Sequence, residues 1–142
     1  HKKGVNMKHQ WTVQNFMSSL PWTIGSEQPL KKAMDLMQEH QIHHLPVLQG
    51  KKLVGILTER DIAVARSFQG SAELRVEGVM MPMTYAVPPE TSLSEVCEHM
   101  AQHKIGSAVI QSLDGVVIGI FTANDGLRAL SEILKESFRL AI

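Results

Sequence analysis

The feature that most constrains the fold of this chain is an internal repeat. When the sequence is shifted by 63 positions, residues of the first half fall on identical residues of the second half, and a shift of 64 continues the match further along. The aligned pairs include Val13 with Val76, Met17 with Met80, Leu30 with Leu93, Gly55 with Gly119 and Asp61 with Asp125. Self-similarity at such a period indicates one supersecondary unit that occurs twice.

Each copy has the pattern of a β-α-β-β-α unit. A short extended piece, at residues 22–24 and again at 85–87, precedes a segment with the apolar period of a helix. Two apolar runs around a glycine follow, which predicts hairpins from 45–48 with 53–57 and from 107–111 with 116–121. Second helices are predicted over 59–66 and 123–136. The apolar positions of the two first helices are Leu30, Ala33, Met34 and Met37, then Leu93, Val96, Cys97 and Met100.

One unit of this size leaves a face of its sheet bare, and two copies can cover each other. We therefore expect an α+β fold of two repeats, packed through their sheets with pseudo-twofold symmetry and with clefts where they meet. The expected boundaries are an N-terminal arm or non-native remnant at 1–11, repeats at 12–66 and 76–136, a linker at 67–75 and a tail at 137–142. Pro29 suits the first turn of one helix, and Ser92 with Glu95 has the spacing of a capping box in the other.

The composition limits the classes of partner that we expect this protein to bind. Fourteen basic and fourteen acidic residues give a formal charge of zero, so nothing favours a nucleic acid or an anionic bilayer. The longest apolar runs are strand-sized, which predicts no membrane span. A single cysteine cannot form an internal disulfide, and no apolar signal segment opens the chain, so we expect a cytoplasmic protein.

Two heptapeptides end the predicted hairpins at equivalent places. They read Gly-Ile-Leu-Thr-Glu-Arg-Asp at 55–61 and Gly-Ile-Phe-Thr-Ala-Asn-Asp at 119–125. With Ile-His-His-Leu-Pro-Val at 42–47 and the Val-x-x-x-Met openings, they resemble the cystathionine-β-synthase (CBS) repeat, whose signature is G-h-x-T-x-x-D. One such heptapeptide is a weak signal, but two at matching places are specific. The resemblance covers residues 12–131 and implies a tandem CBS pair, a Bateman-type regulatory module that forms a flat homodimer.

The residues of the signature have two physical interpretations. Thr and Asp open the second helix of each copy, where free backbone N–H groups favour a phosphate, and an ionised carboxylate accepts from both hydroxyls of a ribose. Gly55 and Gly119 would let the backbone approach such a ligand closely. The same Thr-x-x-Asp spacing is also that of an N-terminal cap, which needs no ligand.

In the family the adenine lies against the first strand and the start of the second, so the resemblance implies two sets of ligand-binding residues. The first set is Thr23, Ile24, Ile42, His44, Pro46, Thr58, Arg60 and Asp61. The second set is Ala86, Val87, Ile105, Ser107, Val109, Thr122, Asn124 and Asp125. The first set, with Arg60 and two histidines nearby, is the more cationic, and we expect it to favour the more phosphorylated ligand.

Other candidate sites are weaker. The spacing of His40, His43 and His44 could present two imidazoles to one metal, but His103 repeats His40, which favours an interaction with the helix C-terminus instead. Cys97 lies on the apolar face of its helix and is predicted to be a small buried side chain, with no nucleophilic role. The last helix carries an apolar stripe that fits either intrachain packing or a dimer seam: Leu127, Leu130, Ile133, Leu134 and Phe138.

The predicted function is therefore regulatory. We expect a sensor that binds an adenosine-containing ligand, namely AMP, ADP, ATP or S-adenosylmethionine, and that uses no catalytic cofactor and no resident metal. No nucleophile and base are identifiable, so we do not expect an enzyme. The alternative is a ligand-free dimerisation module that positions a partner protein, and the sequence does not identify that effector.

Overall fold

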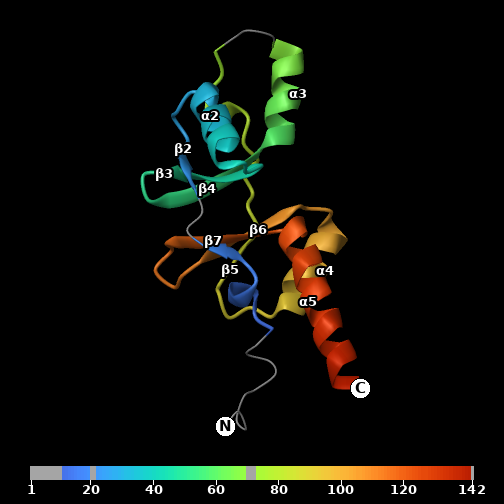
Figure 1. Cartoon of the computed structure of the whole chain (residues 1–142). Coiled ribbons are helices and arrows are strands. Elements are labelled where there is room, and N and C mark those ends of the chain that lie inside the picture. The colour runs from blue at the N-terminus through green and yellow to red at the C-terminus, as the bar shows by residue number, and fades with distance from the viewer. Residues whose placement is uncertain (1–10, 20–21, 70–72, 142) are drawn as a thin grey trace. The chain divides into compact units, whose positions relative to one another are not determined.

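The computed structural model describes residues 11–19, 22–69 and 73–141 of the chain (Figure 1). The α+β class and the two β-α-β-β-α repeats are confirmed, because the described residues form two sheets and four α-helices. The predicted arm up to residue 10, the middle of the predicted linker at 70–72 and residue 142 lie outside the described residues. The elements are η2 Val13–Asn15, β1 Ser18–Ser19, β2 Ile24–Gly25, α2 Leu30–His40, β3 His44–Gln49, β4 Lys52–Thr58, α3 Glu59–Gln69, η3 Val76–Gly78, β5 Ala86–Val87, α4 Leu93–His103, β6 Ser107–Gln111, β7 Val117–Thr122 and α5 Ala123–Ala141.

The chain divides into two compact units. The first unit comprises residues 20–85 with 115–117, and the second comprises 1–19, 86–114 and 118–142. Each unit holds one sheet and two helices, α2 and α3 in the first and α4 and α5 in the second.

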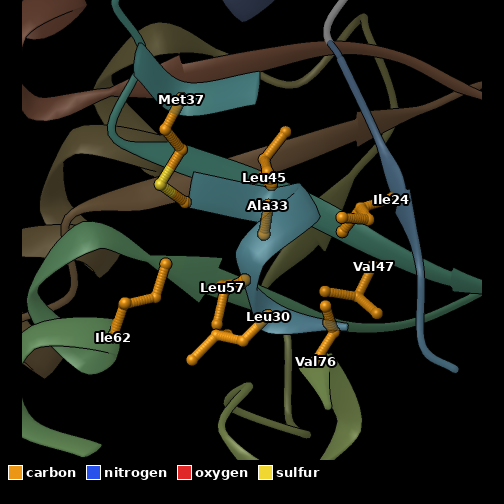
Figure 2. Close-up of a cluster of buried hydrophobic side chains, with 9 residues drawn as sticks. All are labelled: Ile24, Leu30, Ala33, Met37, Leu45, Val47, Leu57, Ile62 and Val76. Carbon is orange, nitrogen blue, oxygen red and sulfur yellow. The ribbon is translucent and has the colours of Figure 1, made fainter. Parts of the chain in front are cut away.

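The sheet of the first unit has the order β2-β3-β4, and both of its helices cover one face (Figure 1). β2 runs parallel to β3, and β3 and β4 form the predicted antiparallel hairpin. The side chains between this sheet and helices α2 and α3 form a buried cluster (Figure 2). Its members are Ile24, Leu30, Ala33, Met37, Leu45, Val47, Leu57, Ile62 and Val76. Apolar burial of this kind contributes about 25 cal/mol per Å² and is the main source of stability for the unit.

The second unit repeats this arrangement. Its sheet has the order β1-β7-β6-β5, with β5 parallel to β6 and β7 beside β6 as the second predicted hairpin. Helix α4 packs against β6 and buries Leu93, Val96 and Met100. The interior of the unit also holds Val13, Ile110 and Phe121, of which none is exposed.

The opening segment of each copy adds to the sheet of the other copy. Ser18 and Ser19 of β1 pair antiparallel with Ile120 and Gly119 of β7. In the first unit Met81, which follows the second Val-x-x-x-Met opening, pairs in the same way with Ile56 of β4. The sequence repeat alone did not reveal this exchange of opening segments between the copies. A repeat shows which residues are equivalent, but it does not show with which copy's sheet a segment pairs.

The predicted hairpin turns are confirmed and Ser92 caps α4 as predicted, whereas Pro29 precedes the first turn of α2. Gly50 and Gly115 have φ values of +62° and +85°, which only glycine adopts without strain in the hairpin turns. Ser92 accepts a 3.1 Å hydrogen bond from the N–H of Glu95, and Pro29 is the N-cap of α2. Both second helices are longer than predicted, since α3 ends at Gln69 and α5 at Ala141.

The prediction for Cys97 is wrong. This side chain is exposed, because α4 buries the narrower set Leu93, Val96 and Met100 and leaves Cys97 at the edge of the apolar face. Partial desolvation nevertheless raises the pKa of the Cys97 thiol, which keeps it in the unreactive protonated form near neutral pH.

Candidate ligand-binding site

The predicted ligand-binding residues of the first copy gather at one end of the first unit's sheet. Ile24 of β2 lies opposite Val47 of the parallel strand β3, so the residues that precede β2 and β3 meet at the same end. His44 lies opposite Thr58, which brings the last residue of β4 to this end as well. Thr23, Ile42, His44, Thr58 and the start of α3 therefore lie toward the same end of this sheet.

Not all of these side chains are available to a ligand. Ile24 belongs to the buried cluster of Figure 2, and Ile42 packs against that cluster from its edge. Pro46 is fully buried within β3. Any ligand contact of Ile24 and Ile42 is thus left largely to their backbone, whereas Thr23 and His44 are only half-buried.

The first turn of α3 holds the polar residues of the first signature. The Thr58 hydroxyl accepts a 3.0 Å hydrogen bond from the N–H of Asp61, and the N–H of Glu59 donates to the carbonyl of His43. The carboxylate of Asp61 is half-buried and has no hydrogen-bond or ion-pair partner among the described residues. The Asp61 carboxylate can therefore still accept hydrogen bonds, because the helix cap uses only the N–H of this residue.

The charges beside this turn differ from the prediction in one respect. His43 Nδ1 forms a close ion-pair contact with the carboxylate of Glu59, and both side chains are largely exposed. His43 is therefore engaged by the Glu59 side chain in this turn. Arg60 is exposed, and within the described residues it has no ion-pair partner, which makes it the free cation at this end of the sheet.

The second signature is arranged differently. Asp125 Oδ2 accepts hydrogen bonds from the N–H of Thr122 at 2.9 Å and from its hydroxyl at 3.2 Å, and the N–H of Asp125 donates back to that hydroxyl at 3.2 Å. These bonds form a complete capping box. Arg128 lies 3.3 Å from Oδ1, Ser18 Oγ lies 3.4 Å from the same oxygen, and Asp125 is only 4% exposed.

The other predicted residues of the second copy lie on β5, on β6, just before β6 and at the start of α5. Ala86 pairs with Val109, so the first two strands of the copy adjoin, and Val87 and Val109 are buried. Ser107 is half-buried, whereas Ile105 and Asn124 are exposed. In this copy the carboxylate of the signature is already occupied.

The signature glycines have a structural role that the sequence interpretation missed. A Cβ on Gly55 would lie 2.7 Å from Met80 Sδ and 2.7 Å from the carbonyl oxygen of Met81. A Cβ on Gly119 would collide with the Met17 side chain. The absence of a side chain at each glycine thus leaves room for a methionine from the opening segment of the other copy. This packing role is separate from the close approach of a ligand that the sequence suggested. The recurrence of both Met and Gly at the repeat interval was the signal that could have revealed this packing.

The remaining candidates lie apart from these residues. His40 stacks on Trp22 with ring centroids 3.7 Å apart, and His103 contacts the carbonyl of His99 one turn earlier in α4. Within the described ranges, no group of three or more potential metal ligands is found, and no helix could cross a membrane. A cavity of about 730 Å³ lies in the first unit between α2, α3 and residues 73–75, and none of the predicted ligand-binding residues lines it.

Comparison with known proteins agrees with this architecture. The CBS domain family model matches residues 13–67 and 76–132. The CBS domain-containing protein YhcV of Bacillus subtilis is 31% identical over 127 residues, which cover 89% of each chain. The inosine-5'-monophosphate dehydrogenase of Korarchaeum cryptofilum is 38% identical over 125 residues, but the match spans 87% of this chain and only 25% of that enzyme.

Among solved structures, the CBS domain pair of protein MJ0100, in complex with 5'-methylthioadenosine and S-adenosyl-L-methionine, superposes with a TM-score of 0.77. It is 26% identical, and the match covers 85% of this chain and 96% of that one. Sequence repeat, fold and family model thus agree, and the chain belongs to the CBS domain family, as a tandem pair of CBS repeats.

Proposed function

We propose that this CBS pair is a regulatory module that binds an adenosine-containing ligand through the signature residues Thr58 and Asp61. The observation that carries the proposal is the Asp61 carboxylate, which lies half-buried in the first turn of α3 without a partner among the described residues. The MJ0100 pair, which was solved with two adenosine compounds, supports the ligand class. The candidates are AMP, ADP, ATP and S-adenosylmethionine.

The chemistry of the first turn of α3 suits a nucleoside. Two ribose hydroxyls can donate to the two oxygens of one carboxylate, and such charge-assisted hydrogen bonds are about twice as strong as neutral ones. The positive end of the α3 dipole and the side chain of Arg60 favour a phosphate nearby. Because Glu59 brings a negative charge to the same turn, its pair with His43 reduces the repulsion that a phosphate would meet.

Ligand binding would act by shifting the population between packing states of the module. In our proposal two chains form a homodimer, and the exposed apolar stripe of α5 takes part in it. Leu127, Leu130, Leu134 and Phe138 of α5 are between 52% and 70% exposed. Apolar side chains of this size at helical spacing favour a protein contact over solvent. The effector that reads the change is a protein of unidentified type.

A ligand-free dimerisation module is the second candidate. The complete capping box around Asp125 favours it, because there the signature stabilises a helix without needing a ligand. The two candidates differ in the role of Asp61. A sensor needs this carboxylate for binding, whereas a scaffold needs it only for the modest stabilisation of a helix terminus.

Thermal melts and isothermal titration with AMP, ADP, ATP and S-adenosylmethionine test the proposal. A ligand that binds only the folded state stabilises it by about 2.7 kcal/mol at a concentration of one hundred times its Kd. We expect at least one of the four to raise the Tm of the wild type and to lose this effect in Asp61→Asn. Glu98→Gln, an exposed carboxylate of α4, is the matched control and should respond like wild type. If none of the four compounds shifts the melt, the sensor proposal is wrong and the dimerisation module is favoured.

A further inference from the structure

The two signature carboxylates differ in how their acceptor sites are used. Asp125 receives hydrogen bonds from the Thr122 N–H and hydroxyl, a contact from Ser18 and an ion pair from Arg128. A carboxylate has about four acceptor positions, so Asp125 has none left for two ribose hydroxyls. The Asp61 carboxylate has no hydrogen-bond or ion-pair partner in the part of the chain that the structure describes.

Two substitutions between the repeats account for two of these contacts, namely those of Ser18 and Arg128 with Asp125. Ser18 pairs with Ile120 in the second unit, and its equivalent in the first unit is Met81, which pairs with Ile56. Arg128 lies one turn after Asp125, and Val64 holds the equivalent place after Asp61. The second copy therefore has a hydroxyl and a guanidinium where the first copy has a thioether and an isopropyl group, neither of which can bind a carboxylate.

We propose that the contacts of Ser18 and Arg128 with Asp125, together called the lock, occupy the carboxylate of the second signature. The tandem pair then binds one adenosine ligand per chain, at Asp61. This inference rests on the proposed function and adds its stoichiometry and its specificity determinants. A ligand at Asp125 would have to displace a guanidinium and the hydroxyl of β1 together, and would also compete with the 2.9 Å bond that caps α5. At Asp61 a ligand would break no such bond with any residue of the described ranges.

The lock has a second consequence. Ser18 and Asp125 are 107 residues apart in sequence, and their contact ties the opening segment to the start of α5. A ligand that captured Asp125 would loosen this tie, whereas a ligand at Asp61 leaves it intact. In this arrangement the second signature is a structural anchor and the first signature is the sensor.

Reciprocal exchange of the two positions tests the inference, with AMP, ATP and S-adenosylmethionine as probes in calorimetric titration. Wild type should bind the responsive probe with a stoichiometry of one per chain. The double variant Ser18→Met with Arg128→Val should bind two, because it frees Asp125. Met81→Ser with Val64→Arg should weaken binding at least tenfold, because it places the same lock on Asp61. Met81 and Val64 are 53% and 50% exposed, so this second variant should fold even where the first is destabilised.

The outcomes separate the two proposals. A wild-type stoichiometry of two, or a Met81→Ser with Val64→Arg protein that binds as tightly as wild type, overturns the lock and leaves the sensor function standing. Binding that survives Asp61→Asn and is lost in Asp125→Asn assigns the sites the other way round and also overturns it. Absence of binding by wild type to every probe overturns the proposed function, and the inference with it.

Discussion

Replacement of each signature aspartate by asparagine should have very different effects on stability. Asparagine preserves the shape of the side chain but removes its charge and turns one acceptor into a donor. In Asp125→Asn the hydrogen bonds from Thr122 lose their charged acceptor, and the Arg128 guanidinium loses its counterion. In Asp61→Asn the side chain has no such bonds to lose within the described part of the chain.

The magnitudes follow from these contacts. Hydrogen bonds to a charged group contribute about 1.5–3 kcal/mol, and a buried donor that loses its acceptor costs a similar amount. Arg128 is 60% exposed, so its ion pair adds only about 0.2–1 kcal/mol. We expect Asp125→Asn to lower the free energy of unfolding by about 2–3 kcal/mol. Asp61→Asn loses only the favourable interaction of a charge with the helix N-terminus, about 0.3–1 kcal/mol.

Urea denaturation followed by circular dichroism measures both values, provided that the transitions are two-state. For a chain of this length 1 kcal/mol corresponds to about 2–4 °C in Tm, so the two variants should melt about 2–11 °C apart. Equal losses of stability in the two variants would refute the argument, since they would show that Asp61 is as fully bonded as Asp125.

Three further perturbations test other parts of the structure. Gly55→Ala should destabilise the protein by about 1–3 kcal/mol in urea denaturation, because its Cβ would meet a backbone carbonyl at 2.7 Å, while Gly78→Ala, which has no atom within 4 Å, should change little. Equal effects of the two glycine variants would contradict the proposed packing. Cys97 should react with iodoacetamide at pH 7.5 more slowly than a free model thiol, as measured by mass spectrometry, because its raised pKa lowers the fraction of reactive thiolate. The rate should increase with pH as the thiolate forms. A rate equal to that of the model thiol would count against the raised pKa. Leu130→Glu with Leu134→Glu should lower the molar mass seen by light scattering to that of one chain without a loss of helical signal, and an unchanged mass would exclude α5 from the dimer contact.

Much of the fold could be predicted from local patterns. The helical period at Leu30, Ala33 and Met37 is the buried face of α2, and the glycines at 50 and 115 take the positive φ that their hairpins require. Ser92 also caps α4 through its hydroxyl, which is one of the two bonds of the predicted capping box. These features depend on residues within a few positions of one another, so the sequence expresses them directly.

The candidate site was only partly predictable. Both Thr-x-x-Asp motifs are evident in the sequence, and their residues gather at the expected strand ends. The exposure of Cys97 was not foreseeable, since helical period places a residue on a face but does not tell how wide the buried part of that face is. The exchange of opening segments was also missed, because strands of two residues carry almost no pattern of their own.

The sequence by itself determined the duplication, the order of elements in each copy and the two motifs that open the second helices. Only the tertiary structure decided that Met80 lies against Gly55 and that Ser18 lies beside Asp125. The physical reason is that both contacts join segments distant along the chain, and the nearly identical local patterns of the two copies cannot specify which distant segment each one receives. Of the groups that bind the Asp125 carboxylate, Thr122 and Arg128 are local neighbours, and Ser18 is the one that this long-range pairing supplies among the described residues.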